Sequence, residues 1–437
     1  MALKLALPIL ANYIAPAFIG LALLAVLLIT LLTNKFNQTL VCSLICIAFV
    51  VTGTSTLGEA FSAFSQNTII MLFGVLIIGE AMMDSGLATI IGNWCIKMAK
   101  GRERRFILMA LAAITVLSAF LDDTAMMAVF LSILVAAKGA SGGKFSMLNM
   151  TMVMSVGSLV GGQLTLVGCT TNINGNALLQ ALTGLEFTMF SFTLANWPIL
   201  ALEFIFMLTI GFKLMKKIWG DRADDAIDFS NIKELGEVNR DKAIKMCVIL
   251  GIMLFGFITQ IVPTGITALI CACLCWGLGV CSMTSSLKSM NWSIFLRMGC
   301  LFSIANCLGS CGFSELVANW FLNTFGSNIS PYFVFAIATF LALALSQVMG
   351  NSAVITVLGT PLLPVAMALG INPKLFMMGI INGASFAYLL PLAGACISLS
   401  QTAGYRFSDY VKFNWFMTIA AYLVTILYVP LIYPLMG

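Results

Sequence analysis

The sequence has very little charge and no histidine. Only 9% of its 437 residues are charged and 60% are hydrophobic, whereas soluble domains carry about 25% charged residues. This composition excludes a soluble globular protein, and the bilayer core is the solvent that fits most of the chain. The missing histidine removes the commonest proton relay. No HExxH or nucleotide-binding motif is present either, so the sequence argues against a membrane enzyme or an ATP-driven pump.

The few charges and the cysteines have simple interpretations. The formal net charge of +5 comes from basic residues between apolar segments, where membrane topology explains them and no nucleic-acid partner is needed. Most of the 13 cysteines lie inside apolar runs, as between Cys271 and Cys281, without paired CxxC motifs. We interpret them as small core residues rather than as disulfides or metal ligands.

Apolar segments that can cross a bilayer recur from end to end. Crossing helices are predicted near residues 14–32, 39–55, 67–91, 146–169, 191–212, 244–262, 265–283, 292–312, 375–398 and 414–434. Two further segments, 106–137 and 331–369, each carry a polar tripeptide at the midpoint, Asp122-Asp123-Thr124 and Gly350-Asn351-Ser352. Each half of 106–137 has about 15 residues, or roughly 22 Å of helix. We therefore predict a re-entrant hairpin there, and by analogy at 331–369.

The distribution of basic residues indicates the topology. Twenty of the 22 Lys and Arg residues lie in the segments 33–38, 95–105, 138–145, 213–245, 284–297 and 404–412. Placing these segments in the cytoplasm gives ten crossings, with eleven left open, and puts both ends of the sequence outside. The first hairpin then enters from the cytoplasm and the second from the exterior. The predicted location is the cell inner membrane, in which the protein is multi-pass.

The two halves of the sequence resemble each other at a nearly constant offset. Residues 84–94 match 310–320, the two polar tripeptides follow in the same order, and 196–197 match 414–415. An odd number of crossings separates the halves, so the repeats have opposite orientations, a plan used by secondary transporters. The predicted fold class is an all-α integral membrane protein with about ten transmembrane helices in two inverted repeats. Each repeat is expected to contain a re-entrant hairpin and a broken helix.

These features divide the chain into four parts. We predict an N-terminal transmembrane helix in 1–38, a first repeat in 39–212 with hairpin 106–137, a cytoplasmic linker loop in 213–243, and a second repeat in 244–437 with hairpin 331–369. Each repeat also has a polar, glycine-rich break after its hairpin, at 161–172 and 383–400. An unwound helix there frees carbonyl groups for cations and N–H groups for anions.

Buried charges are the strongest candidates for function. An ionised carboxylate near the bilayer centre is costly unless it is paired, so Asp122 and Asp123 point to function, with a solvated hairpin end as the alternative. Glu80 and Glu203 also lie in apolar runs, where we expect an interhelical pair or a group near the lipid headgroups. Arg297 lies near a predicted cytoplasmic helix end, so its side chain is expected to snorkel to the interface.

These residues resemble the divalent anion/sodium symporters (solute carrier family 13, INDY-type) of the ion transporter superfamily. The segment 161–172, GGQLTLVGCTTN, resembles that family's GGTxTLIGTPPN stretch, and the segments that begin at 382 and 404 resemble its closing region. Family members carry Ser-Asn-Thr at each hairpin tip, which corresponds here to 122–124 and 350–352. Two aspartates at the first tip resemble instead the superfamily members that exchange Na+ for H+ or export oxyanions.

The resemblance implies a cation-coupled transporter of a small organic anion such as a dicarboxylate, with Na+ as the coupling ion and H+ as the other candidate. It also implies a homodimer in the lipid bilayer and an elevator movement, with Na+/H+ antiport or oxyanion export as the alternative functions. The sodium ligands that it implies are Ser118, Asp122, Asp123 and Gly162 at one site, and Ser346, Met349, Asn351 and Ala393 at a second. The substrate contacts that it implies are Asp123, Thr124, Thr170, Thr171, Asn172, Asn351, Ser352 and Gly394.

The acidic first tip has a direct electrostatic consequence. A carboxylate there strengthens a Na+ site by charge pairing, but it repels a dianion until a cation or a proton neutralises it. We therefore predict obligate cation coupling, with Asp123 as the preferred ligand.

Overall fold

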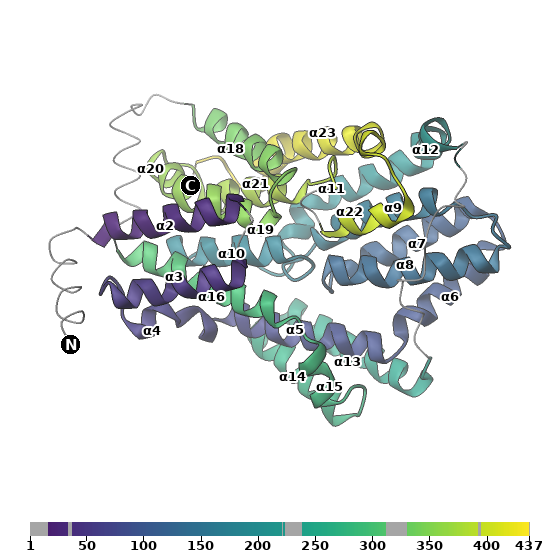
Figure 1. Cartoon of the computed structure of the whole chain (residues 1–437), viewed down its shortest axis with the longest axis horizontal. Helices are drawn as coiled ribbons and strands as arrows, with labels where there is room; N and C mark the ends of the chain where they lie inside the picture. The colour runs from purple at the N-terminus through teal and green to yellow at the C-terminus, as the bar shows by residue number, and fades with distance from the viewer. Residues whose placement is uncertain are drawn as a thin grey trace.

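The computed structural model describes residues 16–33, 37–220, 222, 238–311, 330–391 and 395–436. This part of the chain is helical, and its β-structure is one isolated bridge between Ile371 and Met436. Six of its helices are long and apolar enough to cross a membrane by length and composition. Figure 1 shows most of the helices running along one common direction. The predicted all-α membrane fold is confirmed.

The helices divide between the two halves of the chain. The first half contains α2 (Pro16–Thr33), α3 (Gln38–Val51), α4 (Leu57–Ala60), η1 (Ser62–Ser65), α5 (Asn67–Asp84), α6 (Leu87–Ala99), α7 (Glu103–Ser118), α8 (Asp123–Ala140), α9 (Met147–Gly162), α10 (Thr170–Thr183), α11 (Ser191–Phe206), η2 (Met207–Gly211) and α12 (Phe212–Trp219). The second half contains α13 (Arg240–Thr259), α14 (Thr264–Gly277), α15 (Met283–Ser289), α16 (Trp292–Ser310), α18 (Pro331–Ser346), α19 (Asn351–Val354), η4 (Ile355–Gly359), α20 (Thr360–Ala368), α21 (Pro373–Ser385), α22 (Ala395–Ser400), η5 (Gln401–Ala403) and α23 (Phe407–Ile432).

The helices are interrupted where the polar breaks predict it. In the first half α9 ends at Gly162 and α10 begins at Thr170, and in the second half α21 ends at Ser385 and α22 begins at Ala395. The linker is shorter than the predicted 213–243, because α12 extends to Trp219 and α13 begins at Arg240. Most of the remaining linker lies outside the described residues.

Helix positions repeat between the two halves over a longer stretch than the sequence similarity. Helices α7 and α18 have 16 residues each, and α8 has 18 residues, as does the continuous helix formed by α19, η4 and α20. Helices α2 and α3 likewise have counterparts in α13 and α14, so we infer that the first repeat begins with α2 rather than at residue 39. Packing is reciprocal as well: α5 packs on α14, and α16, the counterpart of α5, packs on α3. This reciprocity supports the predicted inverted repeat.

The helices pack in two groups. The hairpins and broken helices form one group, in which α7 and α8 pack on α9, α18 packs on α21, and α10 and α22 connect the two halves through α21 and α9. The other group contains α2, α3, α5, α13, α14 and α16. In Figure 1, α5, α13, α14 and α15 lie along the lower edge of the molecule, below the hairpin helices α7 and α8.

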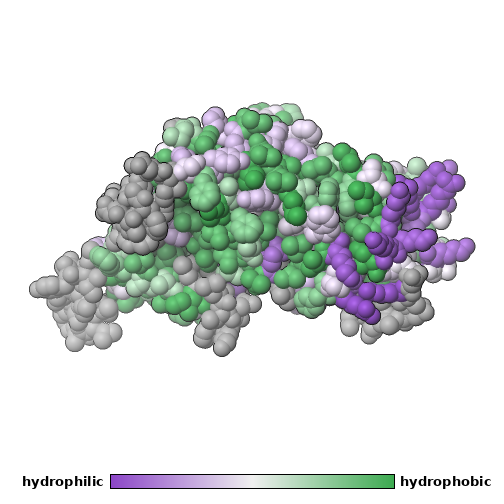
Figure 2. Space-filling model, turned by 90° about the horizontal axis from the view of Figure 1, so that it is seen from above, coloured by the Kyte–Doolittle hydropathy of each residue, from purple (hydrophilic) through white to green (hydrophobic). Residues whose placement is uncertain are grey.

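Hydrophilic residues gather at one end of the molecule, as Figure 2 shows, while the surface of its middle part is mainly hydrophobic. At this end α6 connects to α7, α8 connects to α9, and α12 lies nearby (Figure 1). These connections carry basic residues that the sequence places in the cytoplasm: Lys97, Lys100, Arg102, Arg104, Arg105, Lys138, Lys144, Lys213, Lys216 and Lys217. The grouping is the one that the predicted topology requires.

Two glycines bring the broken helices into backbone contact with the hairpins. Gly161 of α9 faces the main chain of Thr115 in α7, and Gly383 of α21 faces the main chain of Thr339 in α18. A Cβ atom at either glycine would collide with the threonine carbonyl oxygen. Small residues of this kind let helices pack closely in membranes, and here they hold each hairpin against the helix that follows it.

We expect Gly161→Val and Gly383→Val each to lower the free energy of unfolding by about 1–3 kcal/mol or more, because overpacking forces the backbones apart. The melting temperature of the purified protein in detergent measures this effect. Gly251→Val in α13 is the matched control, since a side chain at Gly251 would meet no atom within 4 Å. Equal melting temperatures for all three variants would contradict the expectation.

Candidate functional site

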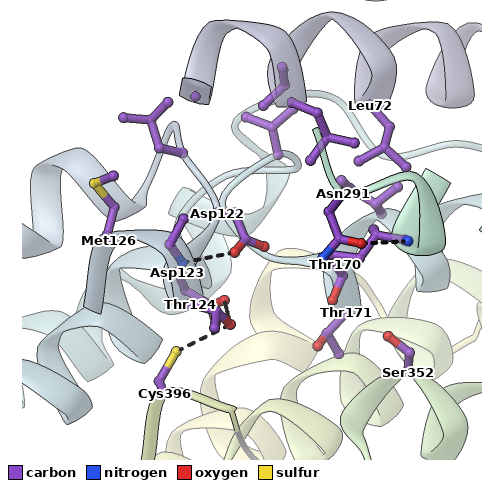
Figure 3. Close-up of a pocket in the computed structure, with 18 of the residues that line it drawn as sticks. Leu72, Asp122, Asp123, Thr124, Met126, Thr170, Thr171, Asn291, Ser352 and Cys396 are labelled. Carbon is purple, nitrogen blue, oxygen red and sulfur yellow. Dashed lines mark hydrogen bonds between the residues drawn. The ribbon is translucent and has the colours of Figure 1, made fainter. Parts of the chain in front are cut away.

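A cavity of about 770 Å³ is lined by both hairpin tips together with α5 and the start of α16. The two polar tripeptides are far apart in sequence, yet both line this cavity. Figure 3 shows Asp122, Asp123 and Thr124 on one side of it, with Thr170, Thr171 and Ser352 across from them. The cavity therefore joins residues of both halves in one polar site.

The structure brings half of the fourteen predicted site residues to this cavity. Seven of them line it: Asp122, Asp123, Thr124, Thr170, Thr171, Asn351 and Ser352. Five lie outside its lining, namely Ser118, Gly162, Asn172, Ser346 and Met349. The remaining two, Ala393 and Gly394, lie outside the described residues.

The first hairpin tip is held by its own aspartates. Asp122 caps α8, and its Oδ1 atom accepts a hydrogen bond of 3.0 Å from the N–H of Ala125, as an N-cap residue does. The N–H of Asp123 donates to the carbonyl of Gly168 over 3.2 Å, which ties the tip to the break between α9 and α10. Within the described residues the ion pair is Arg222–Asp409, so no basic side chain there pairs with either tip carboxylate.

Main-chain oxygens converge beside the first tip. The carbonyl oxygens of Ser118, Ala119 and Gly162 lie 2.5–2.9 Å from where a Cβ on Gly168 would stand. Gly162 in turn is packed so closely on Asp123 that a Cβ there would lie 3.1 Å from the Asp123 Cβ atom. Hard cations are held by carboxylate and carbonyl oxygens. Three members of the first predicted sodium set, Ser118, Asp123 and Gly162, thus lie close together, and the Ser118 hydroxyl donates to Ser158 O over 2.7 Å.

The second hairpin tip is built differently. The Oδ1 atom of Asn351 is a buried acceptor without a donor among the described residues, and Asn174 of the first half donates to Ser352 O over 2.8 Å. Behind the tip, the Nε2 atom of Gln347 lies 3.2 Å from Ser346 Oγ and 3.0 Å from Phe386 O. An amide NH2 group therefore occupies the oxygens next to Ser346, whereas the corresponding residue of the first half is Ala119.

Buried asparagines hold the breaks in both halves. Asn172 donates from Nδ2 to Gly162 O at 3.2 Å and to Thr165 O at 2.7 Å, so it supports the main chain instead of facing the cavity. Asn196 donates to Gln163 O and Asn414 donates to Tyr388 O, each over 2.9 Å. The sequence match of 196–197 with 414–415 thus corresponds to one structural device used twice. Each bond satisfies a carbonyl that the interrupted helix leaves free.

Two charged side chains lie at the cavity, where the sequence did not place them. Glu80 and Arg297 both line the cavity, and Arg297 Nη1 donates to Gln38 Oε1 over 2.8 Å rather than snorkelling as expected. Glu203 is 2% exposed, and its Oε2 atom has no hydrogen-bond partner in the described part of the chain, which does not fit the expected interhelical pair. No sequence signal shows which face of α5 or α16 points toward the cavity.

A polar cavity between two hairpin tips and two broken helices within an apolar bundle is the arrangement of a secondary membrane transporter. The chain belongs to the citrate transporter (CitMHS) family, whose model matches residues 26–381. This result confirms the predicted transporter class, as opposed to an enzyme, and confirms the resemblance at the level of the ion transporter superfamily.

Several relatives are named as transporters. The chain is 29% identical to the uncharacterized transporter YfbS of Escherichia coli over 196 residues, which cover 44% of this chain and 32% of YfbS. It is 23% identical over 330 residues to the uncharacterized transporter slr0753 of Synechocystis, and these residues cover 72% of this chain and 70% of slr0753. Over 110 residues it is 33% identical to mouse solute carrier family 13 member 1, and these residues cover 24% of this chain and 17% of the mouse protein. The chain therefore matches only about a third of the length of YfbS.

Two solved structures share the fold. MtrF of Neisseria gonorrhoeae aligns with a TM-score of 0.62 at 12% identity, over 95% of each chain. The YdaH transporter of Alcanivorax borkumensis aligns with a TM-score of 0.57 at 12% identity, over 97% of this chain and 100% of YdaH. At this level of identity the two alignments show the fold alone.

Thr170 and Asn172 are expected to respond differently to mutation, although they are two residues apart. Asn172→Leu removes the donor to two buried carbonyls and should lower the free energy of unfolding by about 1–3 kcal/mol. Thr170→Val keeps its shape at the cavity, so the melting temperature should not change while substrate affinity falls about 2- to 10-fold. Thermal melts and uptake assays on both variants check this. A stable Asn172→Leu variant with weakened substrate binding would reverse the assignment.

Proposed function

We propose that the protein is a secondary active transporter of the cell inner membrane that couples Na+ to the movement of a small organic anion, such as a di- or tricarboxylate. The observation that carries this proposal is the pair of tip carboxylates, Asp122 and Asp123, beside converging carbonyl oxygens. A carboxylate without a partner costs several kcal/mol in the middle of a membrane. A bound cation removes much of that cost, and carbonyl oxygens complete its coordination.

The same cavity has features that suit an anion once the cation is bound. Helices α8 and α10 begin at Asp123 and Thr170, both of which line the cavity, and helix N-termini attract negative charge. Without a cation, the two tip carboxylates repel an anionic substrate. Binding of Na+ therefore promotes binding of the anion, which is the basis of coupled transport. The family's name, citrate transporter, supports a carboxylate substrate.

We propose one Na+ per cycle, bound in the first half. The second sodium site implied by the resemblance would use Ser346, but there the Gln347 amide already donates to the surrounding oxygens. The Gln347 NH2 group donates to three oxygens there, Leu343 O, Ser346 Oγ and Phe386 O, whereas at the first tip the Asn172 NH2 group reaches Gly162 O alone among the proposed ligands. Asn351, which lines the cavity, is then available to donate to the substrate from its side-chain NH2 group.

The movement that we propose is an elevator movement of a homodimer. The hairpins and broken helices form one packed group, and α3, α5, α14 and α16 belong to another. The cavity is lined by both groups, so sliding of the first group along the second carries the substrate with it. This division supports the proposed mechanism.

Asp123→Asn is the first test of cation coupling. Loss of the charge should lower the apparent Na+ affinity about 10- to 100-fold, the range for a lost charge-assisted interaction. Flux in proteoliposomes under varied Na+ gradients measures the effect. Asp241→Asn, which changes an exposed aspartate in the first turn of α13, is the matched control. If Asp123→Asn transports as fast as the unmodified protein, with the same dependence on Na+ and pH, cation coupling through Asp123 is contradicted.

A ligand screen separates this function from the alternatives. Melting temperatures are recorded with citrate, succinate, sulfate and phosphate, each in Na+ or K+. Stabilisation by Na+ together with one organic anion supports symport, whereas stabilisation by Na+ alone at high pH favours Na+/H+ antiport, and stabilisation by an inorganic oxyanion favours the exporter alternative. MtrF is described as illuminating a class of antimetabolite efflux pumps, so flux is measured in both directions.

The single-cation proposal predicts the Na+ dependence of uptake. The Hill coefficient for Na+ should be about 1, since it cannot exceed the number of coupled sites. Gln347→Ala removes the amide donor and opens the second site, so the Hill coefficient should rise in that variant. A coefficient clearly above 1 in the unmodified protein would show that a second cation binds despite Gln347.

A further inference from the structure

Arg297 is the one basic residue among the described residues that line the cavity, where the acidic residues are Glu80, Asp122 and Asp123. It is the sixth residue of α16, and the sixth residue of its counterpart α5 is Leu72, which also lines the cavity. The second half of the molecule therefore places a guanidinium group where the first half has an apolar side chain. Arg297 is not among the residues of the proposed cation site.

The Arg297 side chain is fixed but not fully used. Its Nη1 atom donates to Gln38 Oε1 over 2.8 Å, and Gln38, the first residue of α3, lines the cavity too. The Nε atom is buried and has no acceptor in the described part of the chain, and no carboxylate there lies within ion-pair distance of Arg297. A guanidinium offers five N–H donors in a planar fork that matches a carboxylate. Arg297 thus has spare donors and an uncompensated charge beside the cavity.

The charges of the cavity imply an orientation for the substrate. One Na+ at the first tip compensates one of the two aspartates, so the tip still repels a second negative group. Arg297 attracts such a group toward the wall formed by α3 and α16. Charge-assisted hydrogen bonds of this kind are about twice as strong as neutral ones.

We propose that Arg297, positioned by Gln38, binds a carboxylate of the substrate and so selects for substrates with an anionic group at the α3–α16 wall. This inference rests on the proposed function and adds to it the residue that distinguishes a dianion from a monoanion. The group recognised is a carboxylate, and the cation site at Asp123 is separate from it.

The test compares succinate with its monoamide, succinamate, which has the same shape but one charge fewer. Binding of each to the purified protein is measured by calorimetry in Na+. The unmodified protein should prefer succinate by about 10- to 100-fold, and Arg297→Gln should remove most of this preference by weakening succinate alone. Arg297→Lys keeps the charge but not the fork, so an intermediate preference is expected. Arg240→Gln at the exposed start of α13 is the matched control.

Each outcome separates this inference from the proposed function. Stabilisation by Na+ alone should be the same in Arg297→Gln as in the unmodified protein, because Arg297 is no part of the cation site. An unchanged preference for succinate in Arg297→Gln overturns the inference and leaves Na+-coupled anion transport standing. Absence of Na+-dependent anion binding in the unmodified protein overturns both. If Arg297→Gln does not fold, Arg297→Lys and Gln38→Leu decide, and an unchanged preference in both overturns the inference.

Discussion

Helices that stop in the middle of a membrane leave carbonyl and N–H groups without partners, and lipid supplies none. The rest of this structure depends on how those groups are satisfied. Side-chain amides bind several of these carbonyls: Asn196 and Asn414 serve equivalent positions in the two halves, Asn172 supports the first break, and Gln347 supports the second. Beside Gly168 the carbonyl oxygens of Ser118, Ala119 and Gly162 stay grouped close to Asp123, with Asn172 donating to the Gly162 oxygen. At the proposed cation site, a bound ion would be the partner of these main-chain oxygens.

The two halves share one fold but differ in the polar groups at their hairpin tips, and this difference gives each half its own ligand. The first tip is acidic and lies beside grouped carbonyl oxygens, which suits a cation. The second tip is neutral, and its Gln347 amide takes the oxygens that a second cation would need. Arg297 adds a positive charge to the cavity wall from the second half only. Negative charge for the cation and positive charge for the anion therefore come from different elements, which lets both ligands occupy one cavity.

The sequence predicted the elements of this fold better than the directions of its side chains. Apolar length and the internal repeat were enough to predict most of the helices, both tips and both breaks, because each of these is a property of consecutive residues. The site was harder. Thr170, Thr171 and Asn172 are adjacent, yet the first two line the cavity and Asn172 turns back to the main chain. Arg297 lies near a helix end, where snorkelling is the ordinary expectation, and only the packing of α16 on α3 brings it to the cavity.

The central claim is that one cation at the acidic tip controls binding of the anion. Linkage requires that Na+ and the anion change each other's affinity by the same factor. The most direct measurement is the dissociation constant of succinate across a range of Na+ concentrations at constant ionic strength, with K+ as the replacement ion. The account predicts that succinate binds at least about tenfold more tightly at saturating Na+ than in K+. The same succinate affinity in Na+ and K+ would contradict it.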